Sequence, residues 1–323
     1  MIDLTKLEFV EGNMYFNEGS PFKGISIHIG LNAVDPDYYH FEGRLKGCEK
    51  DAEYISTLAV GFESIKLLGS EGKATVKDVK GAILESATKL ADDGILFISF
   101  SGHGGQIRAR NEKDGLYETW CLFDEIMSDR EFFVLLTTAH FKRTQRILVI
   151  SDSCHSGTVV GNIPAGSDGL FKDTIDLLSS FLGIENAEIN NHPIELIDNG
   201  FKVIPKDILK KVYNENKNYY DEKQNNTETS FHNINPTQDY RELVDASVLL
   251  ISACQDWQLA RDGVEHGVFT QALKDVLASG ETMNYLKLHQ AIWEKLKDSG
   301  QNPNYYRIGS PNADFEMQTC FTI

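Results

Sequence analysis

The 323-residue chain has few cysteines, no long apolar run and no excess of basic residues. Its five cysteines are odd in number and widely spaced, with no pair at CxxC spacing, so neither a disulfide framework nor a zinc site is predicted. No uninterrupted apolar stretch approaches membrane-spanning length, and the first residues lack a basic segment followed by an apolar one. These absences predict a soluble, cytoplasmic protein without a membrane partner.

Charge and missing motifs exclude two further classes of protein. The formal net charge is -17 and the pI is about 4.9, which argues against a nucleic-acid partner because such surfaces need clustered Lys and Arg. The phosphate-binding patterns GxGxxG and GxxxxGK[ST] are absent, so a nucleotide-binding domain is not favoured. The acidity is compatible with a cationic substrate but does not identify one.

Apolar runs alternate with amphipathic segments along the chain. Strands are predicted at 25–30, 64–68, 95–101, 146–151, 247–253 and 315–321. Helices are expected between them, starting near 47 and 75, and at 131–141, 269–277 and 286–296. This alternation predicts an α/β protein whose mainly parallel sheet is covered by helices on both faces.

Two polar stretches interrupt this pattern. Residues 106–120 are interpreted as a surface loop. The region 160–245 is the least readable, and its very polar run at 214–240 is interpreted as a surface insertion or a flexible linker.

The chemistry is predicted where two of the strands end. The strand at 95–101 is followed by His103, within SGHGG, and the strand at 146–151 is followed by Cys154, within DSCHSG. In open α/β sheets, reactive groups collect beyond the carboxyl ends of the strands, and a nearby imidazole can activate a thiol. We interpret Cys154 and His103 as a catalytic dyad, with the backbone amides of Gly104 and Cys154 as an oxyanion hole. His155 is less suited as the base because side chains of adjacent residues in an extended turn point apart.

Four sequence blocks carry a resemblance to a known family. They are LKGCEKDA at 45–52, SGHG at 101–104, DSCHSG at 152–157 and ISACQDWQLARDGVEHGVFTQAL at 251–273. In this order they resemble the caspase-like cysteine peptidases, best the metacaspase and orthocaspase branch. The resemblance implies a caspase-hemoglobinase-like three-layer sandwich with a central sheet of about six strands. It also implies one peptidase domain over 1–323, with a large-subunit-like part (1–160), a variable insertion (161–245) and a small-subunit-like part (246–323).

The resemblance also implies a specificity pocket. Asp51 and Asp152 match the family's pocket aspartates, and Ser101 and Cys48 match residues that line the same pocket. Two carboxylates favour a guanidinium or an ammonium, so cleavage after Arg first and Lys second is expected. From the residues alone, Asp51 could instead be a favourable charge at a helix N-terminus, and Asp152 a turn or capping residue.

Many relatives bind calcium or cut themselves. The stretch after DSCHSG has no carboxylate, so we predict calcium independence and no cofactor; Glu118, Asp124 and Asp129 are weak calcium candidates. Relatives are often cut after a basic residue between the two subunit-like parts. The candidate self-cleavage residues in the polar segment are Lys210, Lys211, Lys217 and Lys223.

The sequence thus predicts a cysteine endopeptidase that acts through an acyl-enzyme. Its expected partners are proteins or peptides with Arg or Lys at the cleavage site, and a regulatory partner of unknown identity stays open. Two alternatives remain: a catalytically silent caspase-like scaffold or regulator, and an active peptidase with non-basic specificity.

Overall fold

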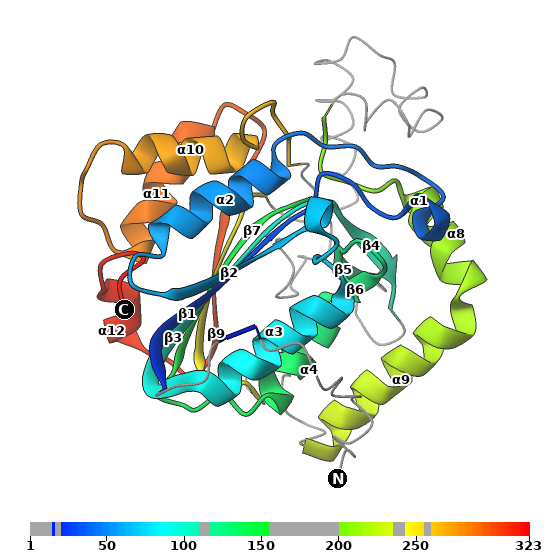
Figure 1. Cartoon of the computed structure of the whole chain (residues 1–323), viewed down its shortest axis with the longest axis horizontal. Helices are drawn as coiled ribbons and strands as arrows, with labels where there is room; N and C mark the ends of the chain where they lie inside the picture. Colours follow the sequence, from blue (N-terminus) through cyan, green and yellow to red (C-terminus); the bar gives the residue numbers. More distant parts are fainter. Residues whose placement is uncertain (1–14, 17–20, 110–115, 155–199, 235–242, 255–259) are drawn as a thin grey trace, which may run out of the picture.

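The computed structural model describes residues 15–16, 21–109, 116–154, 200–234, 243–254 and 260–323. Its centre is a six-stranded sheet in the order β2-β1-β3-β7-β8-β9 (Figure 1). The strands are β1 (Phe22–Gly30), β2 (Glu63–Leu68), β3 (Leu90–Ser101), β7 (Arg146–Asp152), β8 (Ser247–Ser252) and β9 (Asn304–Gly309). The first five run parallel, and β9 pairs antiparallel with β8.

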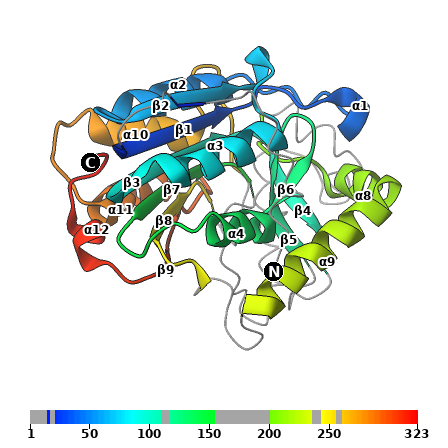
Figure 2. The same cartoon turned by 60° about the horizontal axis from the view of Figure 1, so that its bottom comes forward.

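Helices cover both faces of this sheet, and Figures 1 and 2 show the three layers. One face carries α2 (Cys48–Leu58), α10 (Val268–Leu277), α11 (Tyr285–Leu296) and α12 (Ala313–Met317), and the other carries α3 (Val76–Lys89) and α4 (Asp129–Thr138). Side chains of β3 alternate between the two cores: Ile95 and Phe97 pack on the α10 side, whereas Leu96 and Ile98 pack on the α3 side. The predicted three-layer α/β sandwich is therefore confirmed.

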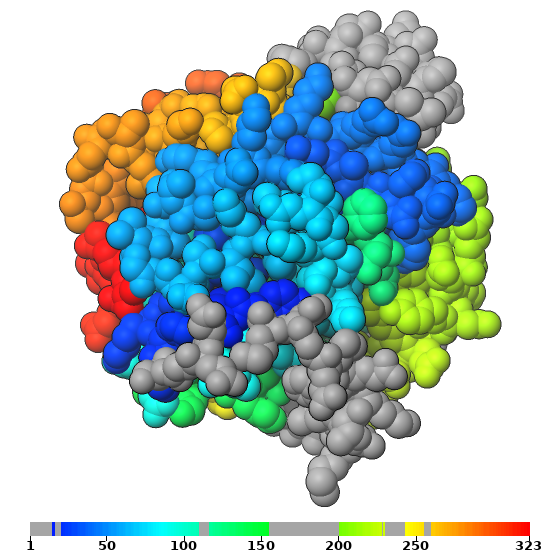
Figure 3. Space-filling model, viewed as in Figure 1, coloured from blue at the N-terminus to red at the C-terminus, as the bar shows by residue number. Residues whose placement is uncertain are grey.

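The parts of the chain before 155 and after 245 form one sheet. Strand β8 pairs with β7, the last strand of the earlier part, and β9 pairs with β8. Atoms of α2 adjoin those of α10 and α11 on the surface in Figure 3. Within the described residues, no helix has both the length and the apolar composition that crossing a membrane requires.

A smaller antiparallel sheet lies beyond the carboxyl ends of the main strands. It consists of β4 (Gly104–Arg108), β5 (Leu116–Cys121) and β6 (Ile126–Ser128), and it packs with α1 (Pro36–Tyr39), α8 (Lys206–Glu215) and α9 (Lys217–Ile234). The predicted surface loop over 106–120 is wrong in the described residues. Tyr117 and Trp120 are buried there, although polar residues stand between them in the sequence.

Two further expectations are corrected. The polar run at 214–240 was expected as a surface insertion or a flexible linker; its described part is the end of α8 and α9, whose Tyr220 and Gln224 are buried, so the flexible linker is wrong there, and an insertion remains a prediction. The expected last strand at 315–321 is instead α12 and the turn after it. The side chain of Asn312 accepts a hydrogen bond from the Phe315 amide and caps this helix.

Candidate active site

The two predicted catalytic residues lie at the same edge of the sheet. Strands β3 and β7 are adjacent and parallel, and Ser101 pairs in register with Asp152. His103 and Cys154 each follow two residues later, and both are buried. The crossover between the two strands therefore brings together side chains that are 51 positions apart in the sequence.

The backbone fixes the orientation of the His103 ring. Its Nε2 lies 2.7 Å from the carbonyl oxygen of Gly43, and its Nδ1 has no hydrogen-bond partner in the described part of the chain. Because a carbonyl only accepts, Nε2 carries the proton and Nδ1 keeps its lone pair. Burial lowers the pKa of His103 to about 4, so the ring is neutral near pH 7 and Nδ1 is available as a base.

The thiol of Cys154 is turned toward the loop after β8. Its Sγ accepts a hydrogen bond from the Ala260 amide at 3.0 Å and donates to the Ala260 carbonyl at 3.4 Å. Burial raises the pKa of Cys154 well above its ordinary value, which favours the thiol over the thiolate. Since Nδ1 of His103 has no partner among the described residues, the dyad is not hydrogen-bonded in this conformation.

The amides of Gly104 and Cys154 converge on one carbonyl oxygen. Both N–H groups donate to the carbonyl of Lys202, at 3.0 and 3.1 Å. A Cβ on Gly104 would lie 2.0 Å from the Cys154 carbonyl oxygen, so only glycine allows this close approach. Two convergent amides beside a cysteine are the arrangement that stabilises an oxyanion in acyl transfer.

The side chain of Lys202 fills the predicted pocket. Its ammonium lies 3.0 Å from one oxygen of each carboxylate, Asp51 and Asp152, and 2.9 Å from the hydroxyl of Ser101. Cys48, the fourth pocket residue inferred from the sequence, is buried nearby, with its Sγ 3.9 Å from the carboxylate of Asp262. Three of the four predicted pocket residues, Asp51, Asp152 and Ser101, therefore contact the Lys202 ammonium.

The three charged side chains of this pocket are fully buried, and their charges depend on one another. Burial acts to lower the pKa of Lys202, but Asp152 and Asp51 outweigh it and hold that pKa well above its ordinary value. For Asp152, burial is the largest influence and raises the pKa, while the Lys202 ammonium opposes it. One of the two Asp152 oxygens, Oδ1, has no hydrogen-bond partner among the described residues.

The backbone around Lys202 binds as an added strand. The Lys202 amide donates to the Ala260 carbonyl at 2.9 Å, and the Asp262 amide donates to the Gly200 carbonyl at 2.6 Å. On the other side, the Ile204 amide donates to the Gly104 carbonyl at 3.0 Å. Extended peptides are recognised in this way, with main-chain hydrogen bonds for affinity and a pocket for the side chain. Residues 200–204 therefore lie between Gly104 and Ala260 as a bound peptide would, and the space that they fill is called the cleft below.

Lys202 was not singled out from the sequence. It stands alone within FKVIP, between apolar residues, whereas attention went to the lysines of the polar run that follows. Those four lie in helices, Lys210 and Lys211 in α8 and Lys217 and Lys223 in α9, and their cleavage remains a prediction. A lone lysine in an apolar pentapeptide was the available signal.

The three calcium candidates are used elsewhere in the structure. Glu118 accepts a hydrogen bond from the Gln106 side chain, Asp124 accepts one from the Val76 amide at the start of α3, and Asp129 accepts one from the Arg130 amide. Among the residues that the structure describes, no three His, Cys, Asp or Glu side chains are grouped to hold a metal ion. Calcium independence remains a prediction.

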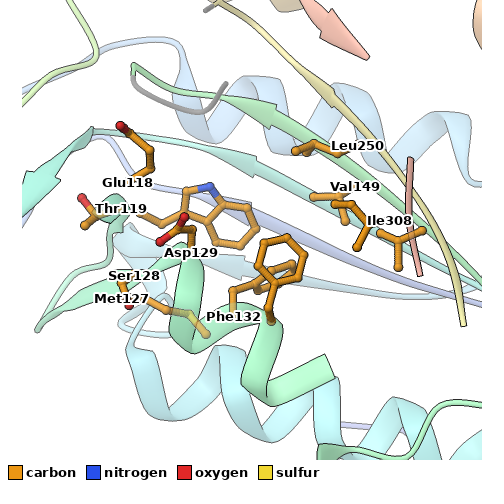
Figure 4. Close-up of a pocket in the computed structure, with 12 residues that line it drawn as sticks. Glu118, Thr119, Met127, Ser128, Asp129, Phe132, Val149, Leu250 and Ile308 are labelled. Atoms are coloured by element: carbon orange, nitrogen blue, oxygen red, sulfur yellow. The ribbon is translucent and has the colours of Figure 1, made fainter. Parts of the chain in front are cut away.

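A separate apolar cavity lies on the α4 side of the sheet (Figure 4). Its walls include Trp120, Phe132, Val149, Leu250 and Ile308. None of its lining residues belongs to the dyad or contacts Lys202, so the chemistry described above lies outside this cavity.

Comparison with known proteins defines the class. The model of the caspase domain family matches residues 32–312, and the chain therefore belongs to the caspase domain family. The predicted resemblance to caspase-like peptidases of the metacaspase branch is confirmed by this family model and by the curated relatives, which are named metacaspases.

The relatives match to different extents. The chain is 24% identical to Metacaspase-9 of Arabidopsis thaliana over 347 residues, which covers 92% of this chain and 97% of that protein. It is 30% identical to Metacaspase-6 of the same plant over 145 residues, 41% of this chain and only 38% of that protein. The solved structure of protein GSU0716 from Geobacter sulfurreducens is 34% identical, with a TM-score of 0.73, and covers 93% of this chain and 99% of that one.

Proposed function

We propose that this chain is a cysteine endopeptidase that hydrolyses peptide bonds after Arg and Lys through the Cys154–His103 dyad. One observation carries the proposal. Residues 200–204 lie in the cleft with the Lys202 ammonium between Asp51 and Asp152 and with the Lys202 carbonyl on the amides of Gly104 and Cys154. Side chain and carbonyl are thus held together as in a substrate ready for attack.

The steps follow from these positions. The thiol of Cys154 leaves Ala260, gives its proton to Nδ1 of His103, and attacks the carbonyl carbon before the bond to be cut. The negative charge moves to the carbonyl oxygen, where the two amides stabilise it. His103 returns the proton to the leaving nitrogen as the C–N bond breaks, which leaves a thioester on Cys154. His103 then takes a proton from water, whose oxygen attacks the thioester carbon; the C–S bond breaks, His103 returns the proton to the Cys154 sulfur, and the new carboxyl group is released.

The pocket supports basic specificity. Two buried carboxylates attract a cation and repel an acidic side chain. Lysine supplies three N–H donors and arginine five, in a planar fork. Because Oδ1 of Asp152 has no partner among the described residues when lysine is bound, arginine offers donors that lysine lacks. This supports the expected preference for Arg over Lys.

The same arrangement adds a self-cleavage bond to those considered from the sequence. The bond between Lys202 and Val203 is the one whose carbonyl the two amides hold. Before it is cut or displaced, this segment blocks the cleft, so the intact chain is a latent peptidase.

Fluorogenic peptides ending in Arg, Lys or Asp test the proposal. They are incubated with the wild type, with Lys202→Ala, which empties the pocket, and with Cys154→Ala as the control. We expect Arg and Lys peptides to be cut by the first two proteins and by no Cys154→Ala sample. Faster cutting of the Asp peptide would contradict the pocket assignment. No turnover by either Cys154-containing protein would favour the silent scaffold.

A further inference from the structure

The turn at the start of α10 contacts both pocket carboxylates. The Gly267 amide lies 3.1 and 3.2 Å from the two oxygens of Asp51. Thr270 donates to Oδ2 of Asp152 through its hydroxyl at 2.7 Å and through its amide at 3.3 Å. These residues are more than 110 positions from either aspartate in the sequence, and they belong to the part of the chain after 245.

Gly267 faces the bound ammonium directly. A Cβ at this position would lie 2.3 Å from the Lys202 Nζ and 2.7 Å from Oδ2 of Asp152. The backbone does not require glycine here, because φ is -59° and ψ is 155°, values that any L residue adopts. Space for the cation is therefore the physical reason for a glycine at this point.

His266 contacts the other carboxylate, that of Asp51, at Oδ1, whereas the Lys202 ammonium contacts Oδ2. Its Nδ1 lies 3.1 Å from Oδ1 of Asp51, and its Nε2 lies 3.0 Å from the Lys274 ammonium. An ammonium can only donate, so Nε2 accepts and the Nδ1–H points to Asp51. Asp51 thus receives hydrogen bonds from His266, Gly267 and Ser101 besides its contact with Lys202.

Two walls of the specificity pocket are α2, with Asp51, and the ends of β3 and β7, with Ser101 and Asp152. We propose that His266, Gly267 and Thr270 form the third wall and determine the selectivity of the pocket for long basic side chains. Gly267 provides the space for the cation. His266 and Thr270 are positioning residues that hold the two carboxylates in place. The inference rests on the proposed function and deepens it by assigning residues to its specificity.

The wall also explains how two carboxylates tolerate an empty pocket. Once the lysine leaves, Asp51 and Asp152 lose the cation that both share. Backbone amides at a helix N-terminus, a hydroxyl and an imidazole N–H remain to stabilise negative charge. The carboxylates therefore keep partners between one basic side chain and the next.

Gly267→Ala tests the steric part of the proposal. In the Lys202→Ala background, we expect kcat/KM for Arg and Lys peptides to fall by at least about tenfold, the range for overfilling a packed site. For a peptide with Ala at the cleavage position, kcat/KM should stay the same or rise. Gly69→Ala is the matched control, because its added Cβ would make only ordinary contacts, the nearest at 3.6 Å. An unchanged ratio of Lys to Ala cleavage in a folded Gly267→Ala protein would overturn the proposal.

Thr270 supplies a second, nearly isosteric test. Thr270→Val removes the hydroxyl that bonds Asp152, whereas Thr270→Ser keeps it. We expect Thr270→Val to raise KM for Lys and Arg peptides about tenfold with little change in kcat, and Thr270→Ser to keep the wild-type KM. Equal effects of Val and Ser would contradict a positioning role.

A readout without turnover separates this inference from the proposed function. In the otherwise unchanged chain, Gly267→Ala should expel Lys202 and open the cleft, so Cys154 should react faster with iodoacetamide than in the wild type, as followed by mass. If neither the wild type nor Lys202→Ala cleaves any peptide but Gly267→Ala still accelerates the reaction of Cys154, the proposed peptidase function is refuted and the wall is supported. Active protein without acceleration would refute the wall alone.

Discussion

Lys202 and Lys223 each lie between a pair of carboxylates, but the Lys202 side chain is fully buried whereas that of Lys223 is 16% exposed. Lys202 lies between Asp51 and Asp152 in the cleft. Lys223, on α9, pairs with Glu125 and with Glu131 of α4, and it also donates to the carbonyl of Ile126 in β6. Burial acts to lower the pKa of both lysines, and in both cases the carboxylates outweigh it and raise that pKa.

The backbone distinguishes the two. Lys223 lies within a helix, and its carbonyl accepts a hydrogen bond from the Thr227 hydroxyl one turn later. Lys202 lies in an extended segment, and its carbonyl accepts from two amides, one of them that of Cys154. A buried ion pair therefore does not mark a site by itself. The proposed site differs in having an extended backbone whose carbonyl lies on two amides beside a thiol.

The carboxylates differ as well. Glu131 has two lysines, Lys223 and Lys80, which overcome the effect of burial and lower its pKa. Asp152 shares its one lysine with Asp51, and burial raises its pKa. The Lys223 cluster is thus well neutralised, as a structural clamp should be, whereas the Lys202 cluster keeps an excess of negative charge that suits the exchange of one cation for another.

The largest expected effect comes from removing Lys202. In Lys202→Ala the segment loses its anchor, so added Lys and Arg peptides should be hydrolysed at once, with an initial rate at least about a hundredfold above that of the intact wild type. Lys202→Arg, which keeps the cation, should remain latent at first. Equal initial rates for Lys202→Ala and the wild type would show that the segment does not block the cleft.

Removing Lys223 should instead cost stability. Lys223→Met leaves Glu125 and Glu131 without their shared cation, and we expect the free energy of unfolding to fall by about 3 kcal/mol in chemical denaturation. Lys211→Met is the control, since Lys211 is exposed and its one ion pair, with Glu215, spans 3.9 Å. The bond cut by the peptidase should not change. A new cleavage site in Lys223→Met would place this lysine in the substrate machinery after all.

The pH dependence of binding should separate the two clusters. Because its pKa is raised, Asp152 takes up a proton at a pH above its ordinary 3.8. As the pH falls toward that raised pKa, KM for a Lys peptide should rise several-fold, and Asp152→Asn should flatten this dependence. An uncharged peptide is the control, and its KM should stay level.

Glu131 should respond with the opposite sign. Its folded pKa is lowered below 4.5, so it stabilises the fold above pH 4.5 and this contribution is lost as the pH falls through the lowered value. Glu131→Gln should therefore unfold with a shallower dependence on pH in that acidic window. The same slope in both proteins would mean that Glu131 is not held as a charged clamp.

Calcium should have the smallest effect. Lysine ammonium groups already occupy both carboxylate clusters, and Glu118, Asp124 and Asp129 accept hydrogen bonds from other groups. Peptide hydrolysis should change by less than about twofold between a chelator and millimolar calcium. A large rise would assign the ion a role that the described residues do not suggest.

The sequence was sufficient for the features that depend on local order. Each predicted catalytic residue follows a strongly apolar strand within a glycine-containing turn, so the adjacency of β3 and β7 brings His103 and Cys154 together. The position of Lys202 could not be predicted from local order, because it depends on the chain returning to the cleft 48 positions after Cys154. The importance of Gly267 could not be predicted, because it depends on how close the Lys202 ammonium lies to this residue, and the sequence does not show that distance.

The misread elements show the same limit. Strand β5 reads LYETWC, where the polar letters suggested a loop although Tyr117 and Trp120 are buried. Helix α9 has a weak apolar stripe and is fixed by a buried tyrosine and by the Lys223 ion pairs with other elements. In each case contacts between distant segments, rather than local propensity, decide the structure.

The most direct test of this account is the intact mass of the purified full chain during incubation with a thiol reductant near pH 7. We predict two fragments, one ending at Lys202 and one beginning at Val203, in the wild type and in Lys202→Arg. Neither fragment should form in Cys154→Ala or in Lys202→Ala. Cleavage only at other lysines, or the same two fragments from Cys154→Ala, would contradict the claim that the chain presents its own Lys202–Val203 bond to the dyad.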